Sequence, residues 1–95
     1  MTSTLTSHAE VATGRPVPYM RQLCKHFGHK LAAEFGPDSG YIEFDAGRCD
    51  LLAAEGELRL VVSAEEAEDL KRLREVVGSH LERFGRRDEL SVTWR

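Results

Sequence analysis

Apolar and polar residues alternate along six short stretches of the chain, and this period of two predicts β-strands. The first stretch runs from Leu5 to the turn at Gly14, the next four cover 31–35, 41–44, 49–53 and 58–62, and the last covers 90–94. Short turns separate the four central stretches. We therefore expect these strands to run antiparallel, because a parallel return needs a crossover of a dozen or more residues.

Two segments instead carry apolar residues at intervals of three and four, which predicts amphipathic helices. The first covers 17–27, and Gly28 is expected to end it in the left-handed conformation. The second is predicted to start at a capping box formed by Ser63 and Glu66 and to end at Gly85. The expected buried stripes are Val17, Met20, Leu23, Cys24 and Phe27 in the first helix, and Leu70, Leu73, Val77, Leu81 and Phe84 in the second.

The predicted order β-α-β-β-β-β-α-β indicates an α+β fold, a two-layer sandwich in which two helices cover one face of an antiparallel sheet. This layout resembles the TATA-binding-protein-like folds with an added strand, an analogy of fold that implies no DNA binding. The first and last strands are expected to pair with each other or with a sheet edge. A chain of 95 residues is expected to form a single domain over 1–95, with a ragged N-terminus over 1–8.

Composition narrows the class of protein. The chain holds 13 Lys and Arg against 16 Asp and Glu, a net charge of −3 that argues against a nucleic-acid partner. No apolar run is long enough to cross a bilayer, and the first residues lack the features of a secretory signal. The two cysteines, Cys24 and Cys49, form no CxxC pair and fall on inward faces. We therefore expect a cytoplasmic protein, without a membrane partner, whose thiols stay reduced.

The string from Cys24 to Lys30 contains a thiol and two imidazoles near the end of the first helix. Such groups can contribute metal ligands. At about 100° per residue, however, Cys24 points with the apolar stripe and His26 lies more than a quarter-turn away. The alternative is a buried thiol with two exposed histidines, His26 and His29, at a helix end.

His80 lies on the flank of the second helical stripe, beside Val76. In one interpretation it is a histidine at the edge of the core, with one ring nitrogen bonded to backbone or water. In the other it faces His26 across the groove between the helices. Together with His29 it would then supply the imidazoles of a zinc, iron or haem site, or a pH-sensitive base.

Each of two clusters of charged residues can be interpreted as a binding site or as ordinary surface charge. Arg83 and its neighbours Arg86 and Arg87 can take an anionic ligand, or they can match the negative end of the second helix. The acidic residues near one predicted hairpin can bind a divalent cation, or they can form a solvated strand face. This acidic cluster comprises Glu43, Asp45 and Asp50. No nucleophile elbow, phosphate-binding loop or HExxH motif is present, so no catalytic residue is assigned.

The strings RQLCKHFGHK, VVGSHLERF and RRDELSVTW, which lie between Arg21 and Trp94, are distinctive. They resemble the bacterial family catalogued as domain of unknown function 2218, over nearly the whole chain from Ala9. The resemblance implies a small stand-alone protein, or a module that some relatives join to siderophore-interacting flavin reductases. The flavin domain itself is absent here, so reductase activity is not implied. The positions that carry the motif, without assigned roles, are His26, Phe27, His29, His80, Arg83 and Phe84.

These observations favour a binding or accessory module rather than an enzyme. The resemblance links it to iron or siderophore handling, with a siderophore-interacting flavin reductase as partner. One alternative is a small metal- or haem-binding protein or enzyme using His26, His29 and His80. Another is a structural homodimer that pairs through an open sheet edge. The sequence requires no cofactor, although iron, zinc or haem would suit the imidazoles. The candidate ligand or metal site comprises His26, His29, His80 and Arg83.

Overall fold

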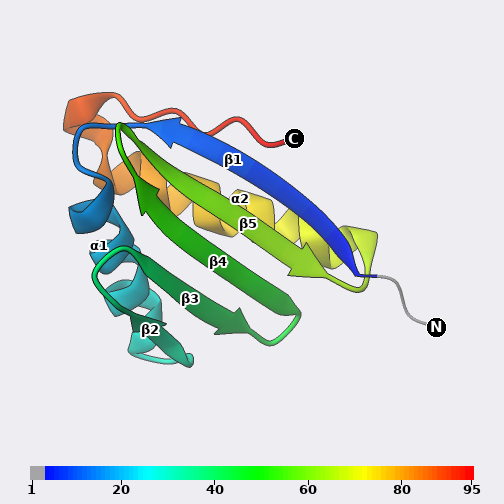
Figure 1. Cartoon of the computed structure of the whole chain (residues 1–95). Helices are drawn as coiled ribbons and strands as arrows, with labels where there is room; N and C mark the ends of the chain where they lie inside the picture. The colour runs from blue at the N-terminus through cyan, green and yellow to red at the C-terminus, as the bar shows by residue number, and fades with distance from the viewer. Residues whose placement is uncertain (1–3) are drawn as a thin grey trace.

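The computed structural model describes residues 4–95 and contains one five-stranded sheet. Its strand order is β1-β5-β4-β3-β2, and every neighbouring pair is antiparallel (Figure 1). The strands are β1 (Leu5–Ala12), β2 (Ala33–Phe35), β3 (Ser39–Phe44), β4 (Gly47–Ala54) and β5 (Glu57–Ala64). The expected ragged end over 1–8 is therefore wrong from residue 5 onward. Residues 5–8 belong to β1, and residues 1–3 lie outside the described part of the chain.

Both long helices, α1 (Pro16–Gly28) and α2 (Ala67–Phe84), lie on the same face of this sheet (Figure 1). A short 3-10 helix, η1 (Arg86–Asp88), follows α2. The α+β sandwich and its antiparallel sheet are confirmed, and the order β-α-β-β-β-β-α is the TATA-binding-protein-like layout without the added strand. Neither helix is both long enough and apolar enough to span a membrane.

The core fills the space between the helices and the inner face of the sheet. Strand register aligns the inward positions, so that Ala9 stands opposite Leu60 and Leu60 opposite Leu51. Most predicted inward residues of the strands from 41 to 62 are buried, as are the centres of both helical stripes. The exception is the first of the four central stretches, where Phe35 is 36% exposed on the edge strand β2. Fully enclosed side chains include Met20, Leu23, Ile42, Cys49, Leu58, Leu60, Val62, Val77 and Leu81. The period-two and period-three-to-four patterns therefore identified the core correctly.

The predicted closing strand over 90–94 is wrong. The backbone of this segment forms no ladder, and the Val92 N–H donates instead to the Glu82 carboxylate at 3.0 Å. The apolar side chains turn to α2 instead, where Val92 and Trp94 lie over Gly78. Only the last residue reaches the sheet, where Arg95 and His8 exchange both backbone hydrogen bonds, at 2.8 and 3.1 Å. The C-terminal segment thus runs beside β1 (Figure 1), as a strap rather than a strand.

The second helix ends at Gly85 as predicted, but two other predicted helix-end features differ from the observed ones. Ser63 is not a helix cap, because its backbone pairs with β1 and β4 and strand β5 continues to Ala64. Helix α2 begins after Glu66, without a side-chain cap. Gly28 is not left-handed either, since α1 ends through His29 in the right-handed conformation.

Candidate functional site

The imidazoles of His26 and His80 meet where the two helices approach each other. His26 lies in the last turn of α1, and His80 lies one turn before the end of α2. Their ring centroids are 4.9 Å apart, with 46° between the ring planes. The contact joins residues from opposite ends of the chain, so it exists only because the sheet holds the two helices side by side.

Phenylalanine rings surround this histidine pair. His26 meets Phe84 edge-on, with centroids 5.5 Å apart, and His80 lies 5.0 Å from Phe27. Phe27 in turn packs at 5.2 Å against Phe44 of β3, which connects the pair to the core. We call these five residues, His26, Phe27, Phe44, His80 and Phe84, the aromatic cluster.

His80 uses one ring nitrogen on its own helix. Its Nδ1 lies 2.7 Å from the Val76 carbonyl oxygen, which can only accept, so Nδ1 carries the proton. Nε2 is left as an acceptor in the neutral ring. The prediction of a half-buried histidine bonded to the backbone is confirmed, and the same ring faces His26 as the alternative interpretation expected.

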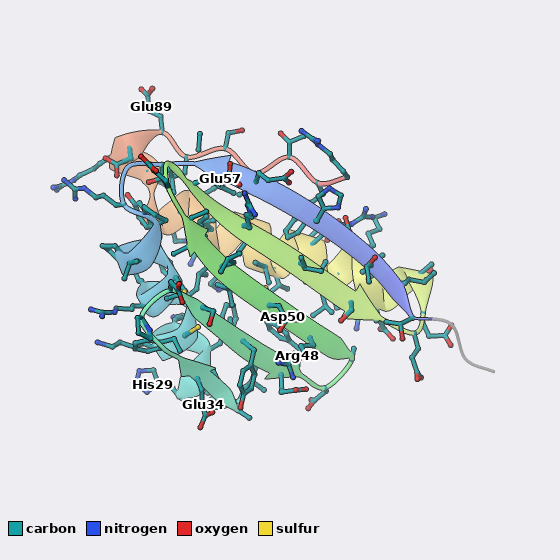
Figure 2. All side chains as sticks on the ribbon, viewed as in Figure 1. His29, Glu34, Arg48, Asp50, Glu57 and Glu89 are labelled. Atoms are coloured by element: carbon teal, nitrogen blue, oxygen red, sulfur yellow. The ribbon has the colours of Figure 1, made fainter. Side chains whose placement is uncertain are left out.

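His29 does not join the aromatic cluster. It is exposed just beyond the end of α1 (Figure 2), and it shares with His26 a surface hollow of about 540 Å³. Basic side chains, Arg21 and Lys25, also line this hollow, and Phe84 borders it. We call the hollow the histidine groove.

The donor set does not fit a metal held by the protein. A structural zinc site needs four protein ligands and a catalytic one needs three. Within residues 4–95, no group of three or more His, Cys, Asp or Glu side chains is arranged to hold an ion. The Cys24 thiol points into the core, 3.8 Å from the Glu34 carbonyl oxygen. His26 and His80 therefore offer at most a pair of nitrogens.

Arg83 lies apart from the histidine groove. It lines an adjoining hollow of about 570 Å³, together with Arg15, Arg86 and Arg87. The two hollows share three lining residues, Pro18, Gln22 and Phe84. We call this second hollow the arginine cleft. Of the predicted site residues, the structure thus brings His26 to His80 and places His29 beside His26. Arg83 lines the neighbouring arginine cleft instead.

Two residues of the acidic cluster, Glu43 and Asp50, pair on the outer face of the sheet with an arginine that the sequence analysis did not consider. Arg48 pairs with Glu43 at 2.6 Å and with Asp50 at 3.0 Å (Figure 2). The hydrogen bond to Asp50 is the main cause of the raised pKa of Arg48. The Arg48 guanidinium also lies 4.3 Å over the Tyr41 ring. Glu43 and Asp50 are thus engaged in ion pairs with Arg48, and the structure gives no support to a divalent cation at these two residues.

The sequence analysis also did not identify the local excess of positive charge along α1 and its flanks. Between Glu10 and Glu34 the chain carries no acidic residue, although the whole chain has a net charge of −3. The cations in this interval are Arg15, Arg21, Lys25 and Lys30. A count of charges by segment, rather than over the whole chain, would have shown this local excess.

Fold and site together define a small α+β sandwich whose two helices present aromatic and basic residues where they meet. Residues 8–95 match the family described as an uncharacterized protein conserved in bacteria, DUF2218, and the chain belongs to this family. It is 31% identical to the Pseudomonas aeruginosa protein PA4090, whose NMR structure has the same fold. That comparison covers 95% of this chain and 94% of the other, with a TM-score of 0.80. No curated protein matches the chain.

Proposed function

We propose that the protein is a non-enzymatic binding module that takes an anionic, iron-bearing ligand of the siderophore type in the histidine groove. Its partner would be a siderophore-interacting flavin reductase. The observation that carries this proposal is the contact between His26 and His80 beside the cations of the groove. The ligand class and the partner come from the family resemblance, and the geometry supports the place of binding.

The groove combines two kinds of attraction that suit such a ligand. The rings of His26 and Phe84 offer apolar faces for stacking. Arg21 and Lys25 add positive charge at the rim. A ferric chelate arrives with its own oxygen ligands, so the protein needs no complete metal site. A pair of imidazoles without further ligands therefore supports this ligand class better than a resident zinc or haem.

The hydrogen bonds around the histidines favour binding over acid–base catalysis. A catalytic imidazole is normally oriented by a carboxylate or a similar partner. Among residues 4–95, no carboxylate hydrogen-bonds to His26 or His80. The Nδ1–H of His80 donates instead to the Val76 carbonyl oxygen. This supports a recognition role for the two rings.

The ligand proposal is tested by titration followed through protein fluorescence and calorimetry. The probe is ferric enterobactin, an anionic tris-catecholate, and the contrasting probe is ferrioxamine B, a cationic ferric chelate. We expect the wild type to bind the anionic chelate more tightly. The double variant His26→Ala, His80→Ala should lose about tenfold or more in affinity, since one stacking or cation contact contributes about 1–2 kcal/mol.

The matched control is His8→Ala, which removes an exposed imidazole from β1 at the far edge of the sheet. Its affinity should equal that of the wild type. Equal affinity in the double variant, or no binding of the anionic chelate by the wild type, would overturn the ligand proposal. The reductase partner is tested separately, by co-elution of the wild type with a purified siderophore-interacting flavin reductase from the same host.

A further inference from the structure

The arginine cleft gathers four guanidinium groups from three parts of the fold. Arg15 directly precedes α1, Arg83 lies in the last turn of α2, and Arg86 and Arg87 belong to η1. All four side chains are exposed and line one hollow of about 570 Å³. Four like charges in one hollow repel one another, so this arrangement needs a reason.

These arginines lack the carboxylate partners found elsewhere on the molecule. Arg48, Arg59 and Arg72 each pair with a carboxylate within 4.0 Å. Within residues 4–95, no such ion pair involves an arginine of the cleft. The planar donors of these four groups are thus free to bind a ligand.

A carboxylate also lines the cleft, but another group holds it. Asp88 accepts a hydrogen bond from the Tyr19 hydroxyl at 2.5 Å, and this bond is the main cause of the raised pKa of Tyr19. Tyr19 is itself buried in the core cluster, which fixes the position of its hydroxyl. The bond engages Asp88 with Tyr19, and the single negative charge of Asp88 offsets only part of the positive charge of the four arginines.

Helix-end charge matching accounts for Arg83, Arg86 and Arg87, but it does not account for Arg15. Arg83 stands at the negative end of α2, where a cation is favourable. Arg15 stands at the positive end of α1, where the helix field opposes a cation, and the first turn of α1 holds no acidic residue to compensate it. An anion from outside the chain would compensate the charge of Arg15.

We infer that the arginine cleft is a binding site for a multiply charged oxyanion, a phosphate or a polycarboxylate. Arginine suits this chemistry because its fork of N–H groups matches two oxygens of one phosphate or carboxylate. The site adjoins the histidine groove, with Pro18, Gln22 and Phe84 lining both hollows, but the inference does not rest on the proposed function. Its ligand is recognised by charge and by paired oxygens, whereas the groove is suited to a larger ligand with stacking faces.

The test is titration at low ionic strength with two probes, inorganic phosphate and citrate, followed by NMR of the backbone and arginine Nε–H signals. We expect saturable shifts at the cleft, and the tighter probe identifies the ligand as phosphate-like or carboxylate-like. The double variant Arg15→Gln, Arg87→Gln should bind at least tenfold more weakly. The matched control Arg74→Gln removes an α2 arginine outside the cleft and should leave affinity unchanged.

Two further variants distinguish binding in the cleft from binding in the histidine groove and from diffuse attraction to positive charge. Tyr19→Phe keeps all four arginines but releases Asp88 to pair with them, so anion affinity should fall while the fold is retained. The variant His26→Ala, His80→Ala should bind both probes normally, whatever it does to the chelate of the proposed function. Shifts that never saturate, or an equal loss of affinity in Arg74→Gln and the cleft variant, would overturn the inference.

Discussion

Gly47 marks a place where α2 and the sheet leave no room for a side chain. A Cβ atom built there would lie 2.1 Å from the Ser63 carbonyl oxygen and 2.6 Å from Cδ1 of Leu73. The first of these contacts is backbone and cannot rotate away. Gly14 is the opposite case, because nothing lies within 4 Å of the corresponding position.

We therefore expect Gly47→Ala to lower the free energy of unfolding by about 1–3 kcal/mol, the usual cost of overpacking. Gly14→Ala should be neutral or stabilise by about 0.4–1 kcal/mol, because it restricts the unfolded chain. Urea unfolding of both variants measures the difference. Equal stability of the two would contradict the close approach of α2 to the start of β4.

The two thiols are buried on the inner side of the sandwich, as the sequence predicted. Cys24 is 2% exposed and Cys49 is fully enclosed, and they are not joined by a disulfide. Burial raises the pKa of Cys24 to about 11, and it raises the pKa of Cys49 as well. A buried thiol is stable in its neutral form and resists thiolate chemistry.

These shifts predict a loss of stability at alkaline pH. Above the ordinary thiol pKa of 9.0 the unfolded chain releases its thiol protons, whereas the folded protein keeps them. The contribution is therefore complete below pH 9.0 and is lost as pH rises toward about 11. Thermal unfolding of the wild type and of Cys24→Ala, Cys49→Ala across this range should show a smaller alkaline decline in the variant. Parallel declines would show that the thiols ionise freely in the folded state.

At the scale of elements, α2 is held by a single buried stripe. Leu81 is fully enclosed near its C-terminal end, in the same helix as His80. Packing along this stripe fixes the rotation of α2 about its axis, and hence the direction in which His80 faces. The aromatic cluster thus depends on the core beneath it.

Leu81→Ala should lower the free energy of unfolding by about 2–5 kcal/mol, because it leaves a cavity in the core. The control Leu52→Ala removes a side chain that is 41% exposed on the outer face of the sheet and should cost far less. Guanidinium unfolding gives both values. A Leu81 variant as stable as the Leu52 variant would show that α2 is rotated differently.

At the scale of the whole molecule, the C-terminal strap connects the two layers. It leaves η1 through Leu90, which is buried, packs Trp94 against α2 and ends on β1 through Arg95. A segment bound to both layers should unfold with them rather than before them.

We therefore expect one cooperative unfolding transition, which would also test the prediction of a single domain. Trp94 is the only tryptophan, so its fluorescence reports on the strap, while far-UV circular dichroism reports on the helices and the sheet. The two thermal midpoints should coincide. An earlier fluorescence transition would mean that the strap detaches on its own.

Several features of this protein follow from the sequence by itself. The central strands, both helices and their inward faces are determined by periods of two and three to four residues, and such patterns are local. His80 at the edge of its stripe and the buried thiols follow from the same periodicity. These predictions succeeded because a buried face requires apolar residues at a regular spacing, whichever part of the chain packs against it.

Other features were decided only by the tertiary structure. Apolar and polar residues alternate over 90–94 as in a strand. Trp94 nevertheless packs on α2, and the Val92 N–H donates to the Glu82 carboxylate. The contact of His26 with His80 and the meeting of Arg15 with Arg83 join positions far apart in the chain. No periodicity records such pairs, because their distance is set by how the sheet places the two helices and not by the residues between them.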